Sequence, residues 1–217
     1  MADKIVKNYT GKGATVTWDS KLCIHVGECG RAKGELFETG RKPWCDPDTS
    51  SDEQTLDVVR RCPTGSLSVV FSDPSKGETC DPENTITVVY GGPLILRGQL
   101  DIQDAPADAP ALKFRAALCR CGMSRNKPFC DNSHATADFS DSGAVGETGT
   151  PLEDTGGALT VAIKQNGPLR ITGNMRIISG SGRPAWQGTS AVLCRCGMSG
   201  NKPFCDGTHR KRQWQDN

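Results

Sequence analysis

Short apolar stretches alternate with turns along this chain, a pattern that predicts a β-rich α+β protein with few helices. Within one stretch Leu112, Phe114, Ala116 and Leu118 alternate with their neighbours, as the buried face of a strand does. The predicted strands are Ala14–Trp18, Ser66–Phe71, Thr85–Tyr90, Leu112–Leu118, Leu159–Ile163 and Thr189–Leu193.

One helix is predicted, between the first two of these strands. Ser51 and Gln54 have the spacing of a capping box, in which each residue caps the backbone of the other. Leu56 and Val59 continue an apolar face, and Pro63 ends the helix because it cannot donate a backbone hydrogen bond.

The second part of the chain repeats itself. CRCGMSRNKPFCDNSH begins at Cys119 and CRCGMSGNKPFCDGTH at Cys194, 75 positions later. The same offset carries Gly92-Pro93-Leu94 onto Gly167-Pro168-Leu169, and Phe139 onto Trp214. A constant offset over such a length indicates a duplication. We therefore predict a domain over 1–71, a linker over 72–83, a first repeat over 84–141, a linker over 142–157 and a second repeat over 158–217.

Composition narrows the class of protein. The 217 residues are 35% hydrophobic and 6% aromatic, so they support modest cores. The formal net charge of +1 gives no indication of a nucleic-acid partner, and no apolar run approaches the roughly 20 residues of a membrane span. No signal-peptide pattern is present, and eleven cysteines cannot all pair in disulfides. We therefore expect a soluble cytoplasmic protein.

The chemistry is concentrated in the repeated motif. Cys194, Cys196, Cys205 and His209 lie within sixteen positions, among glycines and a proline that favour a loop. Thiolates and an imidazole select iron–sulfur clusters, zinc or copper. A single residue separates the first two cysteines, whereas zinc fingers usually have two there.

This motif resembles the CDGSH iron–sulfur, or NEET, family, with Ser199, Pro203, Asp206, Gly207 and Thr208 also matching the pattern. The resemblance implies a [2Fe–2S] cluster on Cys194, Cys196, Cys205 and His209; a zinc site is the alternative. The first copy would hold a second [2Fe–2S] cluster on Cys119, Cys121, Cys130 and His134. It departs from the family at Asn132, where glycine is usual, and we expect asparagine to keep a left-handed backbone there.

The N-terminal domain carries a third set of cysteines. Cys23, Cys29 and Cys62-Pro63 resemble a single-cluster ferredoxin, although Val26 stands where bacterial ferredoxins have a further cysteine. CIHVGEC, RKPW and RCPTGSL more closely resemble the divergent 4Fe–4S mono-cluster domain. This resemblance implies a [3Fe–4S] or [4Fe–4S] cluster on Cys23, Cys29 and Cys62, with His25 or Cys45 as the candidate fourth ligand.

The resemblance also implies an architecture and a role. Single-motif family members form homodimers with swapped strands, so we expect 84–217 to form an intramolecular pseudo-twofold NEET-like unit beside a small ferredoxin-like domain, and the chain to be a monomer. No phosphate loop or catalytic triad is present, so we expect no enzyme. We expect intracellular electron transfer with a redox protein partner; cluster storage and transfer to an apo-acceptor protein is the alternative, and a zinc-bound adaptor the third hypothesis.

Overall fold

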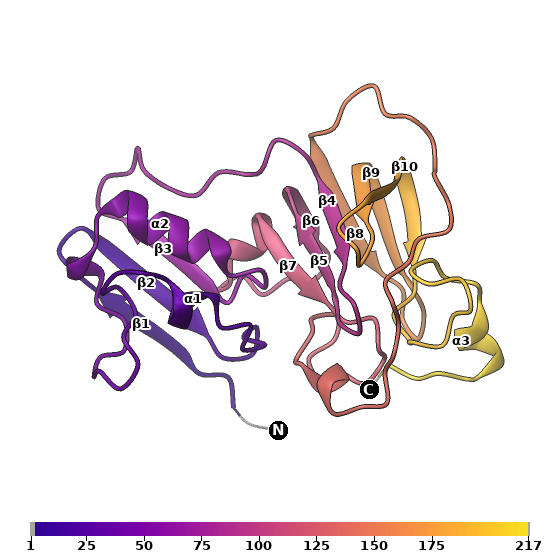
Figure 1. The fold of residues 1–217 in the computed structure, drawn as a ribbon, viewed down its shortest axis with the longest axis horizontal. Coiled ribbons are helices and arrows are strands. Elements are labelled where there is room, and N and C mark those ends of the chain that lie inside the picture. The colour runs from indigo at the N-terminus through magenta and orange to yellow at the C-terminus, as the bar shows by residue number, and fades with distance from the viewer. Residues whose placement is uncertain (1–2, 217) are drawn as a thin grey trace.

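The computed structural model describes residues 3–216. The N-terminal part is a three-stranded antiparallel sheet of β1 (Val6–Thr10), β2 (Ala14–Asp19) and β3 (Leu67–Phe71), in that order. Helix α2 (Asp52–Arg61) packs against this sheet (Figure 1). Two shorter elements connect β2 to α2, namely α1 (Glu28–Arg31) and the 3₁₀ turn η1 (Pro47–Thr49).

Local sequence signals set the bounds of α2. The Ser51 hydroxyl accepts a hydrogen bond from the Gln54 amide, and the Gln54 side chain accepts one from the Ser51 amide, so the predicted capping box is confirmed. The helix ends at Arg61, before Cys62 and Pro63. Val58 and Val59 face the sheet and form the N-terminal core with Val16, Leu36, Phe37, Cys45 and Leu67.

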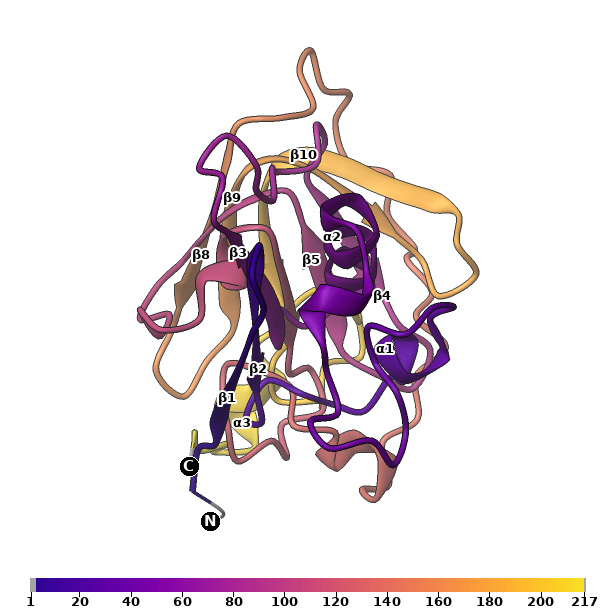
Figure 2. The ribbon, with the colours of Figure 1, turned by 90° about the vertical axis from the view of Figure 1, so that its left-hand side faces the viewer.

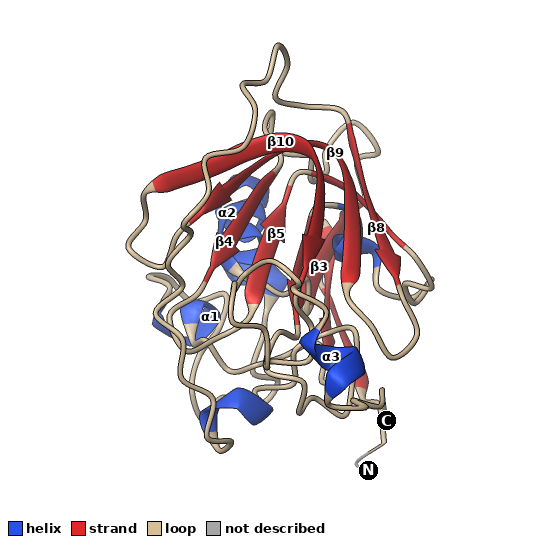
Figure 3. Cartoon of the chain, turned by 90° about the vertical axis from the view of Figure 1, so that its right-hand side faces the viewer, coloured by secondary structure: helices blue, strands red, loops and turns tan. Residues whose placement is uncertain are grey.

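The two repeats build one mixed sheet of seven strands, which curves until it is nearly closed (Figure 3). Its neighbours run β6-β8-β9-β4-β5-β7, and β10 pairs with β9. The strands are β4 (Thr85–Val88), β5 (Leu94–Arg97), β6 (Gln99–Ile102), β7 (Arg115–Leu118), β8 (Ala158–Ile163), β9 (Leu169–Ile178) and β10 (Pro184–Leu193). The turns η2 (Pro110–Lys113) and η3 (Ser133–Ala135) and helix α3 (Thr208–Lys211) lie outside the sheet.

Each repeat contributes a strand to the other repeat's half of the sheet. β4 pairs in parallel with the second half of β9, where Thr85 lies opposite Arg176. β6 pairs in parallel with β8, where Asp101 lies opposite Thr160. By the 75-residue offset, Thr85 corresponds to Thr160 and Asp101 to Arg176. The two parallel pairings are therefore equivalent, with the roles of the repeats exchanged. A single apolar core inside the curved sheet, including Ile86, Leu118, Leu159 and Leu193, therefore belongs to both repeats.

The predicted strand over Leu112–Leu118 is wrong in its first half. Pro110–Lys113 forms the 3₁₀ turn η2, and only Arg115–Leu118 is a strand. Pro110 fixes the start of that turn, and the side chains of Ala111 and Leu112, which belong to the turn, are buried. β4 ends at Val88, two residues before its predicted end, and β10 begins at Pro184, five residues before the predicted start.

The N-terminal domain packs against the first repeat (Figure 2). The segment 72–84 between them contains no helix or strand. Arg115 on β7 is fully buried and forms an ion pair with Glu78 of this segment. Within residues 3–216, the helices are too short or too polar to cross a membrane.

Candidate metal centres

In the second repeat, β10 ends at Leu193 and delivers Cys194 and Cys196 into a buried loop. Their sulfur atoms lie 3.7 Å apart. Further along the same loop, Cys205 Sγ lies 3.4 Å from Nδ1 of His209. Gly207 has a φ of 83° before α3, and this left-handed turn brings His209 back toward Cys205.

The first repeat presents the same arrangement. Cys119 and Cys121 follow β7, with their sulfur atoms 3.7 Å apart. Cys130 Sγ lies 3.3 Å from Nδ1 of His134. Asn132, in the place of Gly207, has a φ of 71°. The expectation that asparagine keeps the left-handed backbone is therefore confirmed.

Each loop offers its four donors as two pairs. Two thiolates on one tetrahedral metal, with metal–sulfur bonds of about 2.3 Å, lie about 3.8 Å apart, so the spacing of each Cys-x-Cys pair suits one metal atom. Within residues 3–216, no three histidine, cysteine or acidic side chains gather in a group that fits a single metal ion. Each loop presents two adjacent donor pairs of the residue types that bind soft and borderline metals.

The pKa values of these donors shift in both directions. Hydrogen bonding to the first cysteine of each pair raises the pKa of Cys121 and Cys196, and burial raises the pKa of Cys130 and Cys205. The Cys121 thiol donates to the Cys119 sulfur and lowers the pKa of Cys119 to about 6, and Cys196 has the same effect on Cys194, whose pKa is also about 6. Burial lowers the pKa of both histidines, with a further effect from Arg120 on His134 and from Arg210 on His209. A neutral imidazole is the form that binds metal, so the sites keep both histidines ready to ligate.

Backbone amides surround the sulfur atoms. The Met123 amide lies 3.5 Å from Cys121 Sγ, and the Asn132 amide 3.4 Å from Cys130 Sγ. In the second repeat the Met198 amide lies 3.5 Å from Cys196 Sγ. Such donors stabilise the negative charge that thiolates bring to a metal centre.

The third set of cysteines surrounds a cavity of about 470 Å³ in the N-terminal domain. Cys23 lies after β2, Cys29 lies in α1 and Cys62 follows α2; all three line the cavity. Burial raises the pKa of Cys29, and the nearby sulfur atoms of Cys62 and Cys23 raise it further. The structure thus brings together the three cysteines that the sequence grouped.

The two candidates for the fourth ligand lie in different surroundings. His25 lines the cavity, and its Nδ1 is 3.9 Å from Cys23 Sγ. It has a φ of 56°, a left-handed conformation that is uncommon for residues other than glycine. Cys45 does not line the cavity; it is 1% exposed and lies in the N-terminal core, against which Cys29 and Cys62 also pack. Burial raises its pKa to about 12, with a smaller contribution from the nearby Cys29.

Comparison with known proteins agrees with this geometry. The family described as "Divergent 4Fe-4S mono-cluster" matches residues 9–72, and the family described as "Iron-binding zinc finger CDGSH type" matches 91–135 and 166–210. The chain is a tandem CDGSH protein with an N-terminal divergent 4Fe–4S mono-cluster domain. It therefore belongs among the iron–sulfur proteins.

Curated relatives of this tandem CDGSH protein include the uncharacterized protein YjdI of Escherichia coli strain K12 and that of strain O157:H7. Each is 39% identical over 59 residues, which are 27% of this chain and 78% of the relative. No solved structure matches the chain.

The arginine between the cysteines of each CDGSH motif has a structural role that the sequence analysis missed. Arg120 and Arg195 are both 1% exposed. Their Nε atoms donate to the carbonyl oxygens of Gly92 and Gly167, at 2.8 and 3.0 Å. Each also pairs with a later aspartate and stacks on an aromatic ring, so the chain beyond each histidine is tied back to its loop. The partners are Asp141 and Phe139 in the first repeat, and Asp216 and Trp214 in the second. The sequence did contain a signal for this role, because the arginine, the aromatic residue and the aspartate of the first repeat each recur 75 positions later.

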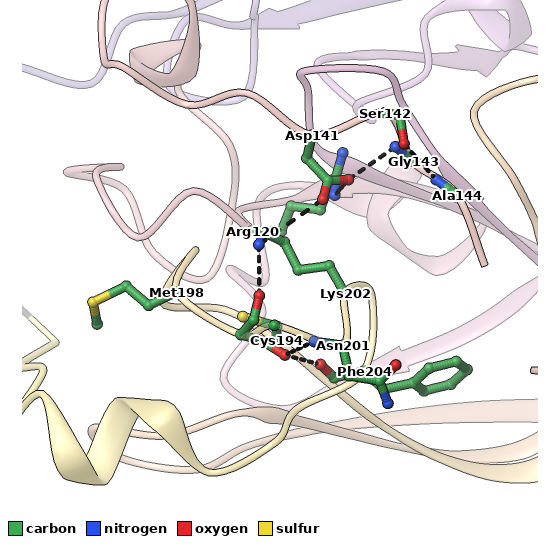
Figure 4. A network of polar contacts seen from close by, with 12 residues as sticks. Arg120, Asp141, Ser142, Gly143, Ala144, Cys194, Met198, Asn201, Lys202 and Phe204 are labelled. Carbon is green, nitrogen blue, oxygen red and sulfur yellow. Dashed lines mark hydrogen bonds and ion pairs between the residues drawn. The ribbon is translucent and has the colours of Figure 1, made fainter. Parts of the chain in front are cut away.

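Polar contacts also cross between the repeats. Asp141 pairs with Arg120, accepts from the Gly143 amide and lies 3.9 Å from Nζ of Lys202 in the other repeat (Figure 4). Lys202 in turn donates to the Ser199 carbonyl oxygen. The loop of the second CDGSH motif is thus fastened to the end of the first repeat.

The N-terminal site lies next to the site of the first CDGSH motif. Ile24, which lines the N-terminal cavity between Cys23 and His25, packs against Cys130 and Ala117. Arg115 on β7 donates from Nε to the carbonyl oxygen of Cys62, over 2.6 Å. Position 115 corresponds to Ser190 in the second repeat, and this difference was the only signal for Arg115 in the sequence.

Proposed function

We propose that this protein transfers single electrons between redox proteins through three iron–sulfur clusters. The proposal places [2Fe–2S] clusters on the two CDGSH loops, because each loop presents its donors as one pair of cysteines and one cysteine–histidine pair. When bound, each cluster supplies a centre that gains or loses one electron. The two repeats form a NEET-like pseudo-twofold unit in this proposal, and the chain acts as a monomer.

For the N-terminal site we propose a [4Fe–4S] cluster on Cys23, Cys29, Cys62 and His25. A cubane needs a fourth ligand, and His25 lines the cavity whereas Cys45 packs into the core. The left-handed backbone at His25 is a second reason, since uncommon backbone conformations tend to occur at functional sites.

One observation carries the proposal of electron transfer: Ile24 contacts Cys130 while its neighbours Cys23 and His25 line the N-terminal cavity. A single side chain thus separates the N-terminal site from a ligand of the first CDGSH site. The two CDGSH loops also touch, since the backbone of Gly122 packs against that of Cys196. Three closely spaced sites suit a chain of electron carriers. We propose no catalytic role, because every histidine of the chain is in a proposed ligand set.

Redox titration of the anaerobically reconstituted protein tests this function. Iron analysis should give about eight iron atoms per chain for two [2Fe–2S] clusters and one [4Fe–4S] cluster. EPR spectra should show reversible one-electron reduction of more than one cluster. Clusters that break down on their first reduction would contradict electron transfer.

Cluster donation is the second candidate function, favoured by the partial exposure of Cys205 in the second repeat. An exposed ligand is open to attack by an acceptor's thiol. Mixing the loaded protein with an apo-ferredoxin separates the two functions, because donation moves iron to the acceptor whereas electron transfer leaves the iron content of each protein unchanged.

A further inference from the structure

The two repeats differ in what covers the neighbourhood of their cysteine–histidine pairs. In the first repeat, Ile95 and Ala117 lie opposite each other on β5 and β7, and both pack with Ile24 of the N-terminal domain and with Cys130. This position is therefore apolar and covered by the chain itself.

The corresponding position in the second repeat is charged and open. Arg170 and Val192 lie opposite each other on β9 and β10, in the places of Ile95 and Ala117. Arg170 is exposed, and Val192 is 37% exposed. The Cys205 amide donates to the Val192 carbonyl oxygen over 2.8 Å, so this strand pair lies directly beside a proposed cluster ligand.

Helix α3 adds more positive charge next to the other ligand of the pair. Arg210, Lys211 and Arg212 follow His209 directly, and all three are exposed. The first repeat has Ala135, Thr136 and Ala137 at these positions. Arg210 and Lys211 lie in α3, and Arg212 follows its last residue. Within residues 3–216, none of these three side chains forms an ion pair with a carboxylate.

The nearby carboxylates are fewer and already engaged. Asp206 accepts the amides of Gly200 and Thr208, and Glu147 accepts from the side chain of Asn201. The full chain has a net charge of only +1, so the charge near His209 is a local feature. We call the set Arg170, Arg210, Lys211 and Arg212 the basic face.

We infer that the basic face docks an acidic electron-transfer protein and so makes the second repeat the site of electron exchange with a partner. The inference rests on the proposed function. Opposite charges around two redox centres steer the encounter and orient the partners. The N-terminal domain covers the equivalent position of the first repeat, which leaves the second as the open end of the three sites (Figure 1).

The test measures how fast a reduced acidic plant-type [2Fe–2S] ferredoxin, used as the probe, reduces the oxidised, fully loaded protein in a stopped-flow spectrometer. The variant combines Arg210→Ala, Lys211→Thr and Arg212→Ala, which gives the second repeat the residues of the first. Its second-order rate constant should fall at least about tenfold at low ionic strength. The difference from the parent should disappear at about 1 M salt, where charges are screened beyond about 3 Å.

The control combines Lys12→Ala, Lys33→Ala and Lys113→Ala, which removes the same net charge from exposed positions elsewhere. Its rate constant should change less than about twofold. Equal rate constants and salt dependences for the parent and the α3 variant would overturn the inference. A different binding partner would also overturn it. In that case the parent would bind DNA or anionic phosphatidylserine vesicles and the α3 variant would not, while the variant kept the parental rate constant with ferredoxin.

A small cationic reductant, the methyl viologen radical, separates this inference from the proposed function. It needs no docking surface, and at about 1 M salt its own charge is screened from the basic face, so it should then reduce the parent and the α3 variant at similar rates. Clusters that viologen cannot reduce reversibly would contradict electron transfer itself. If viologen reduces the clusters but the rate constant with ferredoxin is the same for the parent and the α3 variant, only the role of the basic face would be contradicted.

Discussion

Gly122 and Gly197 lie against each other's loops where the two repeats meet. A Cβ atom at Gly122 would collide with the carbonyl oxygen of Cys196, and one at Gly197 with that of Cys121. Both residues have left-handed backbones, with φ of 80° and 81°. The two Cys-x-Cys loops therefore support each other, and a change in one loop should affect both sites.

Gly122→Ala should destabilise both proposed [2Fe–2S] sites. The left-handed backbone alone costs alanine about 1–2 kcal/mol, and the collision with Cys196 adds to this. Gly182→Ala is the control, because Gly182 has a φ of 82° and no atom within 4 Å of its Cβ position. Urea unfolding of the loaded proteins, with visible absorbance as the signal, should give a clearly larger loss for Gly122→Ala. Equal losses would mean that the contact between the loops contributes nothing.

A second prediction concerns the connection between the N-terminal domain and β7. The Arg115 guanidinium donates to the carbonyl oxygens of Val59, Cys62 and Leu67 and pairs with Glu78. Arg115→Met leaves that buried carboxylate and those carbonyl groups without a partner, so it should cost about 3–5 kcal/mol. The N-terminal domain should then unfold in a separate transition.

Urea unfolding monitored by the N-terminal cluster's absorbance checks this prediction. Arg61→Met is the matched control, since Arg61 forms an exposed ion pair with Asp57 one turn away on α2. Such pairs contribute about 0.3–0.5 kcal/mol. If Arg115→Met cost no more than this control, Arg115 would not hold the domains together.

Local signals predicted the local parts of this structure well. The capping box at Ser51 and Gln54 fixed the start of α2, because both partners lie within one helical turn. The left-handed turn at Asn132 followed from the chemistry of a single position. The grouping of Cys23, Cys29 and Cys62 followed from a family pattern, and the three residues do line one cavity.

Features that depend on distant partners were not predictable in this way. The alternation over Leu112–Leu118 resembles a strand, yet Leu112 is buried from a 3₁₀ turn that fills the core. β10 extends back to Pro184 because β9 offers a long partner strand. Arg115 is buried only because another domain covers it, and nothing within 84–141 indicates that domain.

The fourth ligand of the N-terminal cluster leads to a third prediction. His25→Asn removes the imidazole but keeps a side chain that tolerates the left-handed backbone. The variant should therefore fold and should carry a [3Fe–4S] cluster, visible by EPR in the oxidised protein. Cys45→Ser should leave the cluster type unchanged, since Cys45 does not line the cavity. A [3Fe–4S] signal from Cys45→Ser and not from His25→Asn would assign the fourth ligand to Cys45.

The last prediction concerns acid. Burial holds the pKa of His134 and His209 below the ordinary value of 6.5. A depressed pKa in the folded protein means that the neutral imidazole is favoured there, and that this contribution to stability is lost as the pH falls from about 6.5 toward the lowered value. A released imidazole also takes up a proton, which pulls the equilibrium toward cluster loss. The visible absorbance of both [2Fe–2S] clusters should therefore decay faster with each step below pH 6.5.

Exchanging the imidazole for a thiolate tests this mechanism one cluster at a time. His209→Cys keeps four ligands, so the second cluster should bleach more slowly in mild acid, while the first cluster of the same molecule serves as the internal control. His134→Cys should have the reverse effect. The replaced cluster should also have a lower reduction potential, because it gains about one negative charge and approaches the four-thiolate ferredoxins at about −400 mV. If both variants bleached as fast as the parent, protonation of histidine would not be the trigger. The step that limits cluster loss would then lie at the cysteines.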